Sequence, residues 1–267
     1  MKPCAGWGSC GWRRDMKILG IDTATEACSV ALWNDGVLVR RFVRAGRSHS
    51  EQLRPMVAAV LAETGLRVAD VDAFVGGIGP GSFAGLRIGV AFVQGLAAAR
   101  ERPVVAISSL ELLALQGFAN GYDEVLAAID ARMGEVYVAQ YSRDGAGFPL
   151  AVLAPQVCSP AAVTIAEGKI PALGIGSGWA VHGAAMESAL GAAAPAVRLV
   201  EALPDIADGM AFAAAQLAAG GGRGAAQLQP LYLRNKVALT TAEQQRARGI
   251  SAPIPLPPPP PTRGGEF

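Results

Sequence analysis

The pattern of hydrophobic and polar residues predicts a run of strands and helices in the first half of the chain. Alternating apolar and polar positions predict three strands in a meander, with a turn at Asn34, Asp35 and Gly36. Apolar residues at helical spacing then predict helices that alternate with single strands. The expected elements are strands 17–22, 28–33 and 37–43, helix 51–64, strand 73–78, helix 86–100, strand 104–107 and helix 109–118.

The second half repeats this order. Its expected elements are strands 125–130, 135–141 and 150–153, a short helix after Ser159, strand 172–175, helix 180–190, strand 197–200 and helix 204–219. Both halves open with hairpins instead of strand–helix–strand units, which favours a duplicated ribonuclease-H-like α/β fold with two subdomains. A single doubly wound sheet is the alternative.

The start of the first helix carries two conflicting signals. Ser48 and Glu51 have the spacing of a capping box. Pro55, however, removes a backbone donor and crowds the preceding turn, so it predicts a kink or a later helix start.

The domain boundaries follow from this pattern. We expect subdomains at 16–115 and 116–236, with helix 204–219 packing back on the first. Residues 1–15 show no periodicity, and residues 237–267 contain the proline run 257–261, so both ends are expected to be disordered.

Composition excludes several classes of protein. The chain has 267 residues, of which 51% are hydrophobic, and a net charge of +1, which by itself does not indicate a nucleic-acid binder. The apolar stretch 86–99 contains Arg87 and Gln94 and falls short of the roughly 20 residues of a membrane span. Residues 1–15 lack the apolar core of a signal peptide. Four cysteines form neither a disulfide framework nor a zinc pattern. We therefore expect a cytoplasmic protein.

The loop Asp22-Thr23-Ala24-Thr25 follows the first strand, and Asp130 ends the matching strand of the second half. Backbone N–H groups and hydroxyls in such a loop bind anions, with the aspartate near hydrated Mg²⁺. We interpret Asp22, Thr23, Thr25 and Asp130 as a vestigial phosphate site. The alternative for the loop is an Asx-type turn ordered by its own side chain.

A glycine-rich loop joins the strand 73–78 to the helix 86–100, at a helix N-terminus suited to anions. Its residues are Gly79, Pro80, Gly81, Ser82, Phe83, Ala84, Gly85, Leu86, Arg87, Ile88 and Gly89. The loop lacks the lysine of a Walker loop. Its glycines equally suit turns and close helix packing.

Two further clusters have two interpretations each. Gly174, Gly176 and Gly178 suit close passage of a nucleotide or a simple strand-to-helix turn. The cluster Arg40, Arg41, Arg44 and Arg47 suits a charge-protected strand edge or contact with RNA phosphates.

Several strings together resemble the TsaB (YeaZ) family over residues 16–236. They are Ile21–Thr23, Ser48–Leu53, Gly79–Gly89, Ser108–Leu110 and Ile129–Arg132, in this order. The string Gly-Pro-Gly-Ser-Phe-x-Gly-Leu-Arg is highly specific, although Ala84 stands where the family usually has threonine.

The resemblance implies an actin-like (ASKHA) fold and a scaffolding role beside a catalytic paralogue, TsaD, with which the chain would form a heterodimer. With the ATPase TsaE, the complex transfers threonylcarbamoyl to the anticodon-adjacent adenosine of tRNAs that read ANN codons. A second copy of this chain is the alternative partner when TsaD is absent. No cofactor is expected.

The residues argue against catalysis by this chain. Catalytic paralogues carry a His-x-x-x-His metal pair after the strand equivalent to 104–107, where this chain has Ser109 and Leu113. Because leucine is no ligand and serine a poor one, we expect no metal and no catalytic residue. His49 is interpreted as a side chain of the helix-cap region. The alternatives are an ATP-dependent small-molecule kinase of the same superfold and a metalloprotease homologue.

The helix 86–100 is apolar on all sides, which predicts cover on two faces. Leu86, Val90, Val93 and Ala97 form the stripe expected to face the sheet. A partner chain is expected on the opposite side, or the helix 51–64 alone covers it. The predicted partner interface comprises Ile88, Ala91, Phe92, Gly95 and Ala99, with Met56 and Val60 of the neighbouring helix.

Overall fold

The first sheet is a mixed sheet of five strands in the order β3-β2-β1-β4-β5. A computed structural model describes residues 16–34, 36–46 and 48–234. Strands β1, β2 and β3 pair antiparallel as a meander, whereas β4 and β5 continue the sheet in parallel from β1. The strands are β1 (Lys17–Asp22), β2 (Ala27–Asn34), β3 (Val37–Arg44), β4 (Ala73–Gly77) and β5 (Val104–Ile107).

The second sheet repeats this topology with the order β10-β9-β6-β7-β8. Strands β6, β7 and β8 are antiparallel, and β9 and β10 follow in parallel. The duplicated fold is therefore confirmed, and the single doubly wound sheet is wrong. The strands are β6 (Glu124–Arg132), β7 (Glu135–Arg143), β8 (Pro149–Cys158), β9 (Leu173–Ile175) and β10 (Val197–Leu199).

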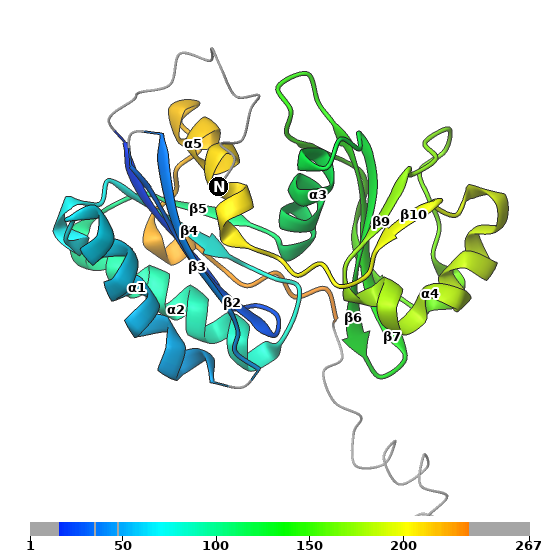
Figure 1. Ribbon diagram of the computed structural model, residues 1–267, viewed down its shortest axis with the longest axis horizontal. Helices are drawn as coiled ribbons and strands as arrows, with labels where there is room; N and C mark the ends of the chain where they lie inside the picture. The colour runs from blue at the N-terminus through cyan, green and yellow to red at the C-terminus, as the bar shows by residue number, and fades with distance from the viewer. Residues whose placement is uncertain (1–15, 35, 47, 235–267) are drawn as a thin grey trace, which may run out of the picture. The chain divides into compact units, whose positions relative to one another are not determined.

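Helices flank each sheet on two sides (Figure 1). The α-helices are α1 (His49–Thr64), α2 (Phe83–Arg100), α3 (Ser109–Ala119), α4 (Ser177–Leu190) and α5 (Met210–Ala218). Short 3₁₀ turns complete the set: η1 (Val68–Asp70), η2 (Pro160–Ala162), η3 (Gly191–Ala193), η4 (Ile206–Gly209) and η5 (Ala225–Gln227). Helix α5 is therefore shorter than predicted, because η4 forms the first turn of the expected helix.

The start of α1 corrects two predictions. The helix begins at His49 and runs through Pro55, so it does not start later. Ser48 occupies the N-cap position, but its side chain makes no capping bond. Its hydroxyl instead donates to the Ala45 carbonyl at 2.8 Å, so the predicted capping box does not form.

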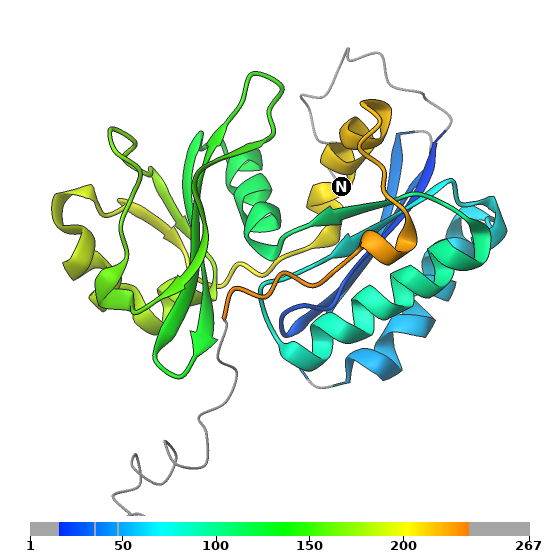
Figure 2. The same ribbon diagram turned by 180° about the vertical axis from the view of Figure 1, so that it is seen from behind.

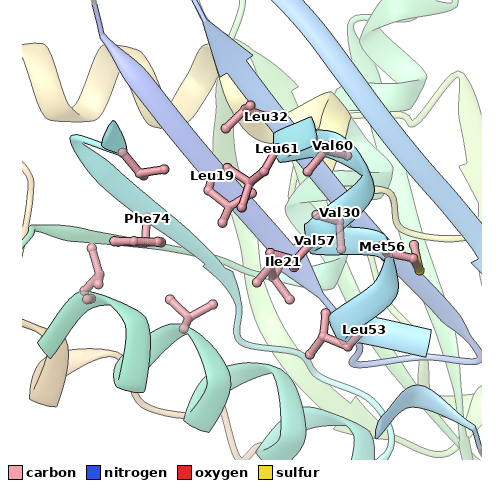
Figure 3. Close-up of a cluster of buried hydrophobic side chains, with 14 of the residues drawn as sticks. Leu19, Ile21, Val30, Leu32, Leu53, Met56, Val57, Val60, Leu61 and Phe74 are labelled. Atoms are coloured by element: carbon pink, nitrogen blue, oxygen red, sulfur yellow. The ribbon is translucent and has the colours of Figure 1, made fainter. Parts of the chain in front are cut away.

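The first core lies between the first sheet and the helices α1 and α2, as Figure 3 shows. Strand residues such as Leu19 and Val30 pack against Val57 and Val60 of α1 and Val93 of α2. The stripe predicted to face the sheet is confirmed, because Leu86, Val90, Val93 and Ala97 are all at most 4% exposed.

Segment 206–214 covers the opposite face of the first sheet, although it follows the second sheet in the sequence. Ile206 of η4 and Met210 of α5 share a buried cluster with Ile18, Val75 and Ile107. The described residues through Leu233 form one compact unit. The predicted boundary at 115/116 falls inside α3, and the division into subdomains stays a prediction.

The predictions for residues 1–15 and 237–267 lie outside the described residues. In the described part of the chain, no helix has the length and apolar character that crossing a membrane requires.

Candidate functional site

Asp22, at the end of β1, is completely buried. Its Oδ1 accepts a hydrogen bond from the Ala24 backbone N–H at 3.1 Å, which forms the Asx-type turn. Its Oδ2 is buried and has no partner among the described residues. Burial raises the pKa of this carboxyl to about 7, and the nearby Asp205 adds to the effect. The Asp22 carboxyl is therefore partly protonated at neutral pH.

The glycine-rich loop packs directly on the loop 22–25. The Ser82 backbone N–H donates to the Ala24 carbonyl at 2.5 Å, and the Thr23 hydroxyl donates to the Gly85 carbonyl at 2.7 Å. A Cβ atom at Gly81 or Gly85 would lie less than 3.0 Å from a backbone carbonyl of that loop. These glycines therefore permit close approach of two backbones, one of the two interpretations of the motif.

The remaining vestigial-site residues lie in different surroundings. Thr23 is 1% exposed and Thr25 is half-buried. The Thr25 carbonyl is bonded to Nε2 of His49 at 2.8 Å, which places His49 at the start of α1 as a structural side chain. A role for these residues toward phosphate stays a prediction.

Asp130 belongs to a separate polar cluster at the end of β6. Its carboxylate pairs with Arg132 at 3.0 Å and contacts Nε2 of His182 at 3.2 Å. Its backbone N–H donates to the Ser177 hydroxyl at 3.2 Å. Across the described ranges, no hydrogen bond or ion pair joins Asp130 to Asp22.

The glycines after β9 serve a strand-to-helix turn. A Cβ atom at Gly174 would meet the Trp179 ring, and Cβ atoms at Gly176 and Gly178 would meet the Ala128 backbone, all at less than 3.0 Å. Close packing within the second half of this chain accounts for all three glycines.

The start of α3 holds Ser109 and Leu113, the two positions compared above with a metal-binding histidine pair. Ser108 caps the helix, because its hydroxyl accepts from the Glu111 N–H at 3.0 Å while the Glu111 carboxylate accepts from the Ser108 N–H at 2.7 Å. Ser109 and Leu113 are each 0% exposed. Leu113 belongs to the second buried cluster, with Leu110, Ile129 and Ile175.

The residues of the predicted partner interface differ in how far they are exposed. Ala91, Gly95 and Ala99 of α2 are exposed, whereas Ile88 and Phe92 are half-buried against the first core. Met56 is 6% exposed and Val60 is 0% exposed. Because Met56 and Val60 are buried in the first core, they offer no surface to a partner chain. The prediction that these two residues belong to the partner interface therefore needs correction.

The arginines of β3 all have carboxylate partners. Arg40 pairs with Asp205 at 3.1 Å, Arg41 pairs with Glu63, and Arg44 lies 3.5 Å from Glu26 and 3.4 Å from Glu201. Arg47 lies outside the described residues. The paired arrangement supports the strand-edge interpretation over contact with RNA phosphates.

Sequence reasoning missed a pocket of about 320 Å³ beside Arg40. Its lining comprises Arg40, Phe42, Gln116, Ala119, Asn120, Leu203, Asp205 and Asp208. Burial and the neighbouring Asp205 raise the pKa of Asp208 to about 6. Its residues come from three distant segments, so no local motif announces it.

Sequence reasoning also missed Tyr232 as a neighbour of the glycine-rich loop. The Arg87 guanidinium lies 3.3 Å from the centre of the Phe83 ring and 5.8 Å from that of Tyr232. Phe83 and Tyr232 are 48% and 50% exposed. The motif loop therefore presents a cation over one aromatic ring and beside a second at the surface.

The described residues contain no group of three or more His, Cys, Asp or Glu side chains placed to hold a metal ion.

Comparison with known proteins gives the family. A family model described as "TsaD: tRNA N6-adenosine threonylcarbamoyltransferase" matches residues 43–235. The tRNA threonylcarbamoyladenosine biosynthesis protein TsaB of Escherichia coli (strain K12) is 42% identical over 231 residues, which cover 84% of this chain and 96% of that protein. The protein of the same name from Haemophilus influenzae is 35% identical over 232 residues, with the same coverage.

Among solved structures, YeaZ from Pseudomonas aeruginosa matches with a TM-score of 0.74 and 36% sequence identity. The match covers 82% of this chain and 100% of that one. The chain thus belongs to the TsaB (YeaZ) family of tRNA threonylcarbamoyladenosine biosynthesis proteins.

Proposed function

We propose that this chain is a non-catalytic subunit of the tRNA threonylcarbamoyladenosine complex, where it binds and activates the catalytic paralogue TsaD and recruits the ATPase TsaE. The complex acts in the cytoplasm on the anticodon-adjacent adenosine of tRNAs that read ANN codons. The observation that carries this proposal is the burial of Leu113 at the start of α3.

Position 113 would hold the second histidine of the metal pair that catalytic paralogues carry. In this chain the side chain at that position fills the second core, in contact range of the turn at Gly176. Ser109, at the first position of the pair, is equally buried. Since neither an alkyl group nor a sequestered hydroxyl binds a transition metal well, these positions support packing rather than metal chemistry.

The exposed residues of α2 support the proposed contact with TsaD. Ala91, Gly95 and Ala99 recur every four residues, so they form one stripe along the helix. All three are exposed and carry no bulky side chain, so the backbone of another helix has room to approach. The proposed contact is this stripe, flanked by the half-buried Ile88 and Phe92.

A charge in this stripe tests the contact. Ala91→Asp places a carboxylate at the centre of the proposed interface, and burying it there without a partner costs several kcal/mol. Ala185→Asp is the matched control, because Ala185 is an exposed alanine of α4 in the second half. We expect Ala91→Asp to abolish co-purification with TsaD and the control to retain it, with both chains folded.

Phe92→Asp is a poorer test, because Phe92 packs on the first core and its replacement also destabilises the monomer. If Ala91→Asp and Ala185→Asp bind TsaD equally well, the α2 stripe is not the interface. Association of the free chain as a homodimer, expected through the same stripe, would be lost in Ala91→Asp as measured by light scattering.

A further inference from the structure

The cluster of Phe83, Arg87 and Tyr232 is not used by the proposed contact with TsaD. Phe83 and Arg87 lie in the first turns of α2, and Tyr232 comes from the C-terminal segment. The two ring centroids are 6.2 Å apart with an interplanar angle of 42°. The guanidinium lies over the Phe83 ring, which holds it in place while its N–H groups stay accessible.

Arg87 differs from the arginines of β3 because no carboxylate pairs with it in the part of the chain that the structure describes. The two segments that build this surface, 73–100 and 209–233, contain no aspartate or glutamate. Neither segment therefore supplies an acidic side chain beside the cation. This charge pattern is complementary to an anion.

The C-terminal segment 223–232 runs along α2 from its C-terminal end to its N-terminal end, in orange in Figure 2. The Gln94 side chain fixes it midway, where Nε2 donates to the Leu228 carbonyl at 2.8 Å. Gln94 follows Arg87 by seven residues, which places both on one stripe of the helix. Arg87 precedes Ala91 by four residues, so the cluster continues the line of the proposed TsaD contact beyond its N-terminal end.

A second basic site lies at the far end of this seam. A pocket of about 430 Å³ is lined by Arg102 and Arg223, with Glu101 and the ends of α2 and η5. Nε of Arg102 is buried and has no acceptor among the described residues. Arg100, the last residue of α2, follows Arg87 by thirteen residues, a helical rise of roughly 20 Å.

We propose that this seam binds single-stranded RNA. An unpaired base stacks on the exposed faces of Phe83 and Tyr232, and Arg87 pairs with the adjoining phosphate. A further phosphate of the same strand lies at Arg102 and Arg223. The inference rests on the proposed function in one respect, since it identifies the biological RNA as the tRNA substrate of the complex.

The test measures binding of the full chain to a fluorescent oligouridylate of about a dozen nucleotides, the size that single-strand sites accommodate. Unmodified tRNA is the second probe. We expect Tyr232→Ala to weaken binding of both probes by about 5- to 100-fold through lost stacking, and Tyr232→Phe to retain it. Arg87→Ala should weaken binding and reduce the slope of log K against log salt by about 0.7. Arg54→Ala, an exposed arginine of α1, is the matched control and should bind as wild type does.

Two results overturn the inference. Wild-type chain that binds neither probe at low salt refutes it, as does equal binding by wild type, Tyr232→Ala and Arg87→Ala. If the two variants lose TsaD while keeping RNA affinity, the cluster is a protein contact instead. Co-purification with TsaD is measured for every variant, so failure of the RNA site is distinguishable from failure of the proposed function.

Discussion

Replacing Gly85 with alanine tests whether the glycine-rich motif exists for contact with the loop 22–25. The added Cβ would lie less than 3.0 Å from the Thr23 carbonyl oxygen, closer than such atoms approach in proteins. That carbonyl cannot move freely, because the Thr23 hydroxyl is bonded to Gly85 and the next residue, Ala24, accepts from Ser82. Either the loop or α2 must shift, with loss of these bonds.

The magnitude follows from two opposing terms. Overpacking of a tightly packed site costs about 1–3 kcal/mol. Alanine gains at most about 1 kcal/mol over glycine inside a helix, and less in the first turn, where Gly85 lies. The net loss is about 1–2 kcal/mol, which corresponds to a Tm lower by about 2–8 °C for a domain of this size.

Gly95→Ala is the matched control in the same helix. Gly95 is exposed, and an added Cβ would have no atom within 4 Å. Only the helix-propensity gain of about 0.5–1 kcal/mol remains, so Tm should rise by about 1–4 °C. The stability of both variants is measured by thermal unfolding, followed by circular dichroism, and by urea unfolding. The urea midpoints are compared at equal m-value. If Gly85→Ala is as stable as wild type, or if Gly95→Ala loses stability to the same degree, the close-approach explanation is refuted.

Two further predictions concern buried side chains. Because burial raises the pKa of Asp22 from 3.8 to about 7, the folded state holds a proton that the unfolded state has released, and stability falls as pH rises from about 4 to 7. Asp22→Asn should remove this dependence and be more stable than wild type at pH 8, with a free energy of unfolding higher by at most about 4 kcal/mol and a higher Tm. Equal Tm profiles of the two proteins from pH 4 to pH 8 would contradict it. Leu113→Ala should cost about 2–5 kcal/mol in urea unfolding, because the side chain is completely buried, whereas Leu150→Ala, at a 57% exposed position, should cost little. A stable Leu113→Ala protein would mean that the start of α3 is not packed as described.

The order of the elements was predictable from local periodicity, because strands and amphipathic helices repeat their apolar residues at characteristic spacings. The stripe of Leu86, Val90, Val93 and Ala97 is an example, since burial of one helix face recurs at fixed spacing. The limits of elements were less predictable. Phe83 starts α2 three residues before the expected Leu86, because Ser82 caps the helix through a side-chain contact with the Gly85 N–H.

The candidate site was harder to predict, because it depends on contacts between distant segments. Tyr232 meets Arg87 across more than a hundred residues, and Arg40 meets Asp205 in the same way. Periodicity also did not tell an exposed apolar residue from a core residue on a helix with two packed sides. Val60 was therefore assigned to the partner interface, although it is completely buried between α1 and the first sheet.

The central claim is that this chain activates a catalytic paralogue without catalysing the transfer itself. The direct measurement is formation of threonylcarbamoyladenosine on unmodified tRNA, with TsaD, TsaE, ATP and threonylcarbamoyl adenylate supplied, in the presence and absence of this chain. The account predicts modification only when the chain and TsaD are both present, none when TsaD is omitted, and loss of modification with Ala91→Asp but not Ala185→Asp. Modification by this chain without TsaD, or full activity of TsaD and TsaE without this chain, would contradict it.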